Sequence, residues 1–146
     1  MNWKAVAAAA AMAGIALGAV NAADGTHDSR VALMKRIGGS TGALSAIAKG
    51  EKPYDAEAVK VALTTIAATS KVFPDQFKPD SDKSDPGVSP KIWENMDDFK
   101  ARAEKLSADA ETALAQLPAD TAAVGATVNT LGANCGGCHK AYRLSK

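Results

Sequence analysis

Apolar residues recur at intervals of three and four along four stretches of this 146-residue chain, at about 26–49, 55–73, 90–116 and 121–143. That spacing places them on one face of an α-helix, and no stretch shows the sustained alternation of a half-buried strand. Helices of roughly 20 residues are about 30 Å long, and short connections between them make neighbours antiparallel. The simplest way to bury four one-sided apolar stripes is an all-α, antiparallel up-down-up-down four-helix bundle.

Residues that start and stop helices stand at the ends of these stretches. Gly50 follows the first, and Asp55 is suited to cap the second before Pro74 ends it. The segment from Pro74 to Ser89 is rich in Pro, Gly, Asp and Ser and is expected to be a loop. Ser89 followed by Pro90 supplies an N-cap and a proline at the first helical position, which predicts one continuous third helix.

The first 22 residues read as an export signal. Lys4 supplies a positive charge, residues 5–20 form an uncharged apolar run, and Val20-Asn21-Ala22 is a small-residue cleavage site. A membrane anchor is the alternative, although the run is slightly short for the roughly 20 apolar residues that a bilayer needs. We expect cleavage of residues 1–22, a mature domain of residues 23–146 in the periplasm, and no membrane span after processing.

The charge balance excludes one class of partner. The chain has 17 basic and 16 acidic residues, and removal of the signal takes away Lys4 and leaves 16 of each. A nucleic-acid surface would need a clustered basic excess, so no nucleic-acid partner is expected. Aromatic residues make up only 5% of the chain, and a large apolar cofactor would help to fill the interior of such a bundle.

Near the C-terminus, Cys135-Gly136-Gly137-Cys138-His139 matches C-x-x-C-H, the attachment pattern for c-type haem. Two thiols three positions apart lie on one face of a helix, where both reach one side of the macrocycle and form thioethers with its two vinyl groups. His139 lies one turn after Cys135, within reach of the iron from the same side. The motif therefore predicts one covalent haem c, held by Cys135 and Cys138, with His139 as an axial iron ligand.

Other interpretations of the motif fit the chain less well. A structural zinc site needs four ligands, and Cys135, Cys138, His139 and His27 are all the Cys and His residues available. A thioredoxin-like dithiol expects strands that the pattern does not predict. A disulfide between the two cysteines would close a very tight loop inside a helix. A helical metal-binding or dithiol protein without haem remains a third alternative.

With the haem motif at the end of the fourth helix, the chain resembles the class II c-type cytochromes, the cytochrome c′ superfamily. The resemblance covers the whole mature chain and implies one haem c inside the bundle, with the first helix crossing the face of the ring opposite His139. It rests on the order and spacing of these motifs: Arg30-x-x-x-Met34-Lys35, Lys49-Gly50, Phe73-Pro74, Phe77-x-Pro79, Pro90-x-Ile92-Trp93 and Cys135-x-x-Cys138-His139-x-x-Tyr142-Arg143.

The resemblance gives Met34 a particular meaning. Members of the superfamily with an apolar residue four positions after the first-helix arginine have five-coordinate, high-spin iron that binds small gases. Members with a methionine there have six-coordinate, low-spin iron and carry electrons. Met34 is therefore expected to be the second axial ligand; the alternatives are that it only packs in the core or that His27 is the sixth ligand.

The resemblance also suggests roles for three polar residues. Arg30 is expected to pair with a haem propionate, which suits the geometry of a guanidinium, and the alternative is an ordinary surface arginine. Arg143, four positions after His139, is expected near the haem, or else as a solvated arginine that favours the helix dipole. Ser81 matches a propionate-contacting position loosely, because the loop that contains it is longer and more acidic than the family pattern.

The first helix carries an apolar stripe and three glycines that follow Met34. Gly38, Gly39 and Gly42 cost about 1 kcal/mol each in helix propensity. Either the helix passes closely over the haem or another helix there, or it is locally broken. The expected stripe consists of Val31, Met34, Ile37, Thr41, Leu44 and Ala48.

These observations predict a periplasmic monohaem cytochrome that acts as a one-electron carrier, with periplasmic or membrane redox proteins as partners. No enzymatic activity is expected, because no nucleophile–base pair is present in the sequence pattern. The alternative is a five-coordinate haem protein that binds or scavenges NO or CO. The protein is expected to be a monomer or a homodimer.

Overall fold

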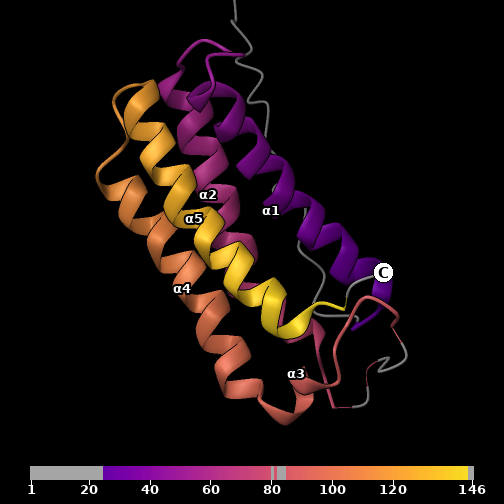
Figure 1. Ribbon diagram of the computed structural model, residues 1–146. Coiled ribbons are helices and arrows are strands. Elements are labelled where there is room, and N and C mark those ends of the chain that lie inside the picture. The colour runs from indigo at the N-terminus through magenta and orange to yellow at the C-terminus, as the bar shows by residue number, and fades with distance from the viewer. Residues whose placement is uncertain (1–24, 80, 82–84, 145–146) are drawn as a thin grey trace, which may run out of the picture.

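The computed structural model describes residues 25–79, 81 and 85–144, so the predicted signal peptide of residues 1–22 lies outside the described part of the chain. Four long helices run up and down side by side (Figure 1). Each packs against two of the others, in the cyclic order α1, α2, α4, α5. This confirms the predicted all-α four-helix bundle. The long helices are α1 (His27–Ala48), α2 (Ala56–Val72), α4 (Met96–Ala115) and α5 (Thr121–Tyr142).

The prediction of one continuous third helix was wrong at its start. Lys91–Glu94 forms a separate short helix, α3, and the helical conformation is interrupted at Asn95 before α4 begins. Both the backbone N–H and the side-chain amide of Asn95 donate to the carbonyl of Lys91, at 2.9 and 3.1 Å, which ends α3 after one turn. The predicted start signal works locally, since Ser89 Oγ accepts a hydrogen bond from the Lys91 amide.

The other predicted helix ends are close to the observed ones. Asp55 caps α2 by accepting from the amides of Glu57 and Ala58. Pro74 ends α2 as predicted, but the chain then makes one turn of 3-10 helix, η1 (Phe73–Gln76), before the loop begins.

The stripe predicted for the first helix was partly wrong. Ile37 and Leu44 are buried as expected, together with Leu33 and Ile47, whereas Met34 is only half-buried. The difference arises because α1 turns one edge toward the bundle core and the neighbouring edge toward a cavity described below.

Neither a close approach to another helix nor a local break in α1 explains its three glycines. The helix is unbroken through Gly38, Gly39 and Gly42. A methyl group added at any of the three would meet no described atom within 4 Å, so no other helix approaches closely there.

The interior divides into an aliphatic end and an aromatic end. The aliphatic core lies between all four long helices and includes Leu44, Leu63, Ile66, Val124 and Leu131. The aromatic cluster lies at the opposite end, where α1 begins and α5 ends. Its buried members are Phe77, Ile92, Phe99 and Tyr142.

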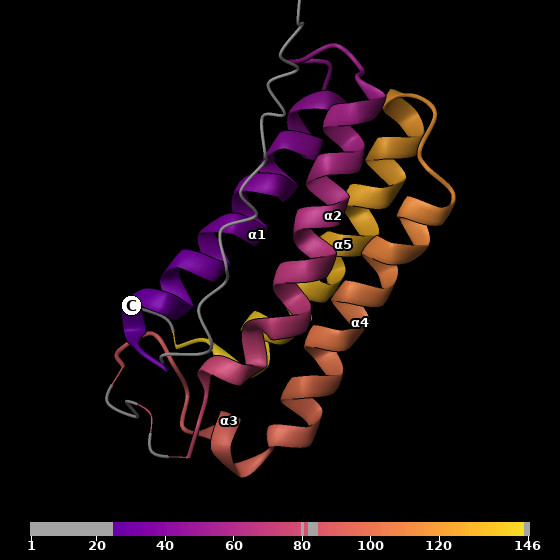
Figure 2. The ribbon, with the colours of Figure 1, turned by 180° about the vertical axis from the view of Figure 1, so that it is seen from behind.

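At the aromatic end, the loop before α3 is fastened to the residues that follow α5. The Ser89 amide donates to the carbonyl of Tyr142 at 3.0 Å, and the Leu144 amide donates to the carbonyl of Gly87 at 3.2 Å. Figure 2 shows this loop, α3 and the start of α1 at the same end of the bundle. None of the described helices is long and apolar enough to cross a membrane.

Leu63 offers a test of the aliphatic core. Its side chain is fully buried, at 0% exposure, so Leu63→Ala is expected to lower the free energy of unfolding by about 2–5 kcal/mol. Val61 lies on the same helix with 55% exposure, and Val61→Ala is the matched control, expected to change stability by less than about 0.5 kcal/mol. Urea unfolding of the two variants measures the difference, and equal losses would contradict the assigned core.

Candidate haem site

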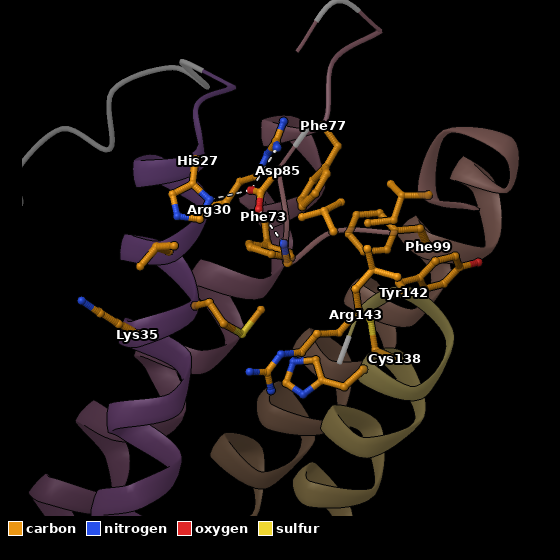
Figure 3. Close-up of a pocket in the computed structure, with 17 residues that line it drawn as sticks. His27, Arg30, Lys35, Phe73, Phe77, Asp85, Phe99, Cys138, Tyr142 and Arg143 are labelled. Atoms are coloured by element: carbon orange, nitrogen blue, oxygen red, sulfur yellow. Dashed lines mark hydrogen bonds and ion pairs between the residues drawn. The ribbon is translucent and has the colours of Figure 1, made fainter. Parts of the chain in front are cut away.

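A cavity of about 530 Å³ opens between the first turns of α1 and the last turns of α5. Arg30 and Met34 line it from α1, and Cys138, His139 and Arg143 line it from α5 and the residue after it. Figure 3 shows His27 and Arg30 on one side of this space, with Cys138 and Arg143 on the other. The structure thus brings together five of the residues that the sequence analysis assigned to the site.

A smaller cavity of about 40 Å³ adjoins the first and shares Met34, Cys138 and His139 with it. Cys135 lines this second space. Ser81 lines neither of them, and it contacts Arg30 instead.

The two cysteines lie on the face of α5 that turns toward the cavities, and both are half-buried free thiols. The disulfide interpretation therefore does not describe this structure. Burial raises the pKa of Cys135, and burial also raises that of Cys138, where the nearby Arg102 charge opposes the effect. Both groups are therefore protonated thiols at neutral pH.

His139 sits one turn after Cys135, where helical spacing directs it to the same side of α5. Burial, followed by the positive charge of Arg143, lowers the pKa of His139. A neutral imidazole, the form that binds iron, is therefore favoured at physiological pH. Within residues 25–79, 81 and 85–144, no three His, Cys, Asp or Glu side chains gather to hold a metal ion.

Arg30 is not an ordinary surface arginine, because only 3% of it is exposed. Its Nη1 lies 3.5 Å from the carboxylate of Asp85, and its Nε and Nη2 donate to the carbonyl of Gln76 at 3.2 Å. Nη2 also donates to the carbonyl of Gly25 and to Ser81 Oγ. The guanidinium therefore joins the start of α1 to η1 and to the loop beyond it.

Asp85 is a site residue that the sequence analysis missed. Burial opposes its ionisation, but a hydrogen bond from the Gly87 amide and the nearby His27 and Arg30 hold its pKa below the usual value. His27 Nδ1 lies 2.7 Å from the Asp85 carboxylate while half of the His27 side chain stays exposed. A single aspartate in a polar loop carries no sequence signal that distinguishes it from its solvated neighbours.

Aromatic rings form the wall of the main cavity. Phe99 lies 4.8 Å from Phe77 and 5.3 Å from Tyr142 between ring centroids, both edge to face, and Phe73 packs edge to face on Phe77 at 5.2 Å. The Tyr142 hydroxyl donates to the Asp98 carboxylate at 2.5 Å, so its polar end faces away from the cluster. The rings give the cavity an apolar side.

These features fit a haem group in four respects. The main cavity has an apolar aromatic wall, the Cys138 thiol and a neutral imidazole, and the Cys135 thiol lines the adjoining cavity. In addition, the hydroxyl of Ser70, which lines the smaller cavity, is buried and lacks a hydrogen-bond partner among the described groups. A chain that folded around no cofactor would be expected to satisfy or to expose such a group.

Comparison with known proteins decides the family. The model of the family described as "Cytochrome C'" matches residues 26–143, which include every site residue named above except Gly25. The chain belongs to the cytochrome c′ family. Members of this family bind one haem c, and the C-x-x-C-H motif at residues 135–139 fits that cofactor. The class II cytochrome assignment made from sequence is confirmed.

Three relatives illustrate the similarity. Cytochrome c-556 of Agrobacterium tumefaciens (strain apple 185) is 72% identical over 122 residues, which cover 84% of this chain and 97% of the relative. The solved structure of cytochrome c′ from Rhodopseudomonas palustris has a TM-score of 0.75 and 34% identity, covering 82% of this chain and 95% of that one. A structural model of oxidised cytochrome c556 from R. palustris has a TM-score of 0.72 and 32% identity over the same shares.

The Asp85 network generates a prediction about acid stability. Because the pKa of Asp85 is lowered in the folded protein, its ionised form stabilises the fold above the unfolded pKa, and this contribution is lost as the pH falls through the lowered value. Asp85→Asn removes a buried negative charge that lies near both Arg30 and His27, and we expect a loss of about 1–3 kcal/mol at pH 7. Below about pH 4 the variant should lose less additional stability than the wild type.

Urea unfolding of the haem-loaded protein between neutral and acid pH measures both effects. Asp97→Asn is the control, since Asp97 is exposed in the first turn of α4 and should leave the acid profile unchanged. An Asp85→Asn profile parallel to that of the wild type would exclude Asp85 as the group responsible.

Proposed function

We propose that this cytochrome c′-family protein is a one-electron carrier whose haem iron is held by His139 and Met34. The observation that carries the proposal is that Met34 of α1 and His139 of α5 line the same two cavities from different helices. The iron supplies a ferric/ferrous couple when the haem is bound. Two protein ligands that stay in place in both oxidation states keep the reorganisation on electron transfer small.

Cys135 and Cys138 are proposed to anchor the haem through thioether bonds at the edge of the ring. Both project from one helix face, so they would fix the ring relative to the axis of α5 and leave His139, on the same side, to bind the iron. The neutral state of the His139 imidazole leaves a nitrogen lone pair for the metal.

Arg30 is proposed to contact a haem propionate, as the family resemblance suggests. Its guanidinium lines the main cavity although several of its N–H groups already bind protein oxygens. Ser81 would then act indirectly, because its hydroxyl holds Nη2 of Arg30 at 2.7 Å. Arg143 lines the cavity near His139, and we propose that its positive charge favours the neutral imidazole.

The low-spin state is supported by the ligand chemistry and by the relatives. A thioether sulfur is a soft ligand that suits c-type haem iron, and Met/His ligation raises the reduction potential. The relative with 72% identity is a cytochrome c-556, and one of the similar solved structures is a cytochrome c556.

A five-coordinate protein that binds or scavenges NO or CO is the second candidate. Its support is the similarity to solved structures of cytochrome c′, such as the R. palustris protein with a TM-score of 0.75. In that case Met34 would line a distal pocket without binding the iron.

The proposed location is the periplasm, after removal of residues 1–22 from a mature domain of residues 23–146. The support is the signal-like N-terminus and the C-x-x-C-H motif. The proposed partners are periplasmic or membrane redox proteins, and the protein is proposed to act as a monomer or homodimer that carries electrons without converting a substrate.

Met34→Ala tests the ligand assignment. The variant is expected to change from a low-spin to a high-spin ferric spectrum. It should also bind CO at least about tenfold more tightly when reduced, because CO no longer has to displace an internal ligand. Met96→Leu is the control, since Met96 lines neither cavity, and its spectrum should stay low-spin. A Met34→Ala spectrum identical to that of the wild type would rule out Met34 as a ligand.

A second test separates attachment from ligation. Replacement of both Cys135 and Cys138 by Ser should give an exported chain whose mass is that of the bare polypeptide, because no thioether forms. His139→Ala should instead keep the added mass of haem while it changes the spectrum. Covalent haem retained by the double Cys variant would contradict the assigned anchors.

A further inference from the structure

Ser70 is a buried hydroxyl that none of the roles assigned so far uses. It lies in the last turn of α2, and only 1% of the residue is exposed. Its Oγ atom has no hydrogen-bond partner among the described residues. A buried hydroxyl without a partner costs about 1–3 kcal/mol, so its persistence in a packed helix calls for a physical account.

The Ser70 hydroxyl does not donate to the backbone carbonyl one turn earlier in α2. A serine or threonine in a helix commonly donates to the carbonyl four residues earlier. Six threonines of this bundle do so, and Ser107 instead donates across the bundle to the carbonyl of Ala67 at 2.9 Å. Ser70 has the carbonyl of Ile66 in the corresponding position and does not bind it. The six threonines are Thr41, Thr64, Thr65, Thr112, Thr127 and Thr130.

The surroundings of Ser70 show what it can meet. It lines the cavity of about 40 Å³ together with Met34, Cys135, Cys138 and His139. Most of the other lining side chains are hydrocarbon, and they cannot accept a hydrogen bond. The remaining lining residues are Ile37, Phe73, Phe99, Arg102, Ala103, Leu106 and Asn134.

A buried water is a poor partner in this space. The volume would admit one water molecule, but such a water needs two to four polar partners. Arg102 and Asn134 already bind the carboxylates of Asp98 and Asp109, at 2.7 and 2.6 Å. Ser70 and the amide oxygen of Asn134 would then be the main polar contacts of the water, fewer than the roughly three that are usual.

Two acceptors that line this space are the amide oxygen of Asn134 on α5 and the sulfur of Met34 on α1, and of these two helices α1 is the one that packs against α2. α1 and α2 pack side by side, and Met34 and Ser70 project from them into the same small space. A thioether sulfur is a weak hydrogen-bond acceptor, and it keeps one lone pair for a donor when the other binds a metal.

We infer that, when the haem is bound, Ser70 donates a hydrogen bond to the sulfur of Met34 and thereby sets the strength of this sulfur as an iron ligand. The inference rests on the proposed function, since it requires Met34 to bind the iron. A hydrogen bond withdraws electron density from the sulfur, which weakens its donation to ferric iron more than to ferrous iron. Ser70 is therefore a positioning and tuning residue that raises the reduction potential, a known effect of hydrogen bonds to axial ligands.

The test is the reduction potential of the haem-loaded Ser70→Ala variant, measured by spectroelectrochemical titration. Loss of the hydroxyl is expected to lower the potential and to shift the charge-transfer absorption between sulfur and ferric iron, while the spectrum stays low-spin. An unchanged or raised potential overturns the inference. Ser107→Ala is the control, because it removes a buried hydroxyl that lines neither cavity, and its potential should equal that of the wild type.

Two variants of equal side-chain volume separate the effect of the hydroxyl from that of a folding defect. Ser70→Thr and Ser70→Val carry the same added bulk, and only Thr keeps the hydroxyl. The potential of the Thr variant is expected to lie above that of the Val variant, and equal potentials overturn the inference.

The wild-type spectrum distinguishes a failure of Met34 ligation from a failure of the Ser70 hydrogen bond. A high-spin ferric wild type would refute Met34 ligation and the role of Ser70 together. A low-spin wild type with no effect of Ser70→Ala would refute the role of Ser70 alone.

Discussion

The structure depends on one constraint: the bundle is filled by side chains at one end, the closed end, and contains a large cavity at the other, the open end. At the closed end, small aliphatic side chains from all four long helices fill the interior. At the open end, α1 and α5 leave a cavity of about 530 Å³ between them. The aromatic cluster and a set of polar contacts hold this end together. The buried guanidinium of Arg30 joins the start of α1 to η1 and the following loop, and the loop in turn pairs with the residues after α5.

The charges of the open end follow from the same arrangement. Burial and the charge of Arg143 favour a neutral His139, while the Gly87 amide, His27 and Arg30 favour an ionised Asp85 despite its burial. The polar groups of the network lie beside α1 and the loop, and the Arg30 guanidinium lies 4.6 Å from the centroid of the Phe77 ring, so charged and aromatic groups line adjoining parts of the cavity. This combination suits a haem, which carries its propionates at one edge of an apolar ring.

Three layers of residues contribute to the proposed site. Cys135, Cys138, His139 and Met34 are the groups proposed to bond to the haem or its iron. Arg30 and the aromatic rings surround the cofactor, and Ser70 is inferred to act one step further out, through the sulfur of Met34. The last two groups form no covalent or metal bond and are proposed to act through packing, charge and hydrogen bonding.

The sequence by itself determined the helical bundle, the covalent motif and the family, because helical periodicity and the C-x-x-C-H spacing are local properties of the chain. It also selected Met34 and Arg30, through their spacing on one helix and the family resemblance. Only the tertiary structure showed that Asp85 is a buried partner of Arg30, that α3 is separate from α4, and that Ser70 faces a cavity. The physical reason is that burial and hydrogen bonding depend on which distant segments meet. An aspartate in a polar loop and a serine in an ordinary helix have the same local sequence whether they face solvent or the interior.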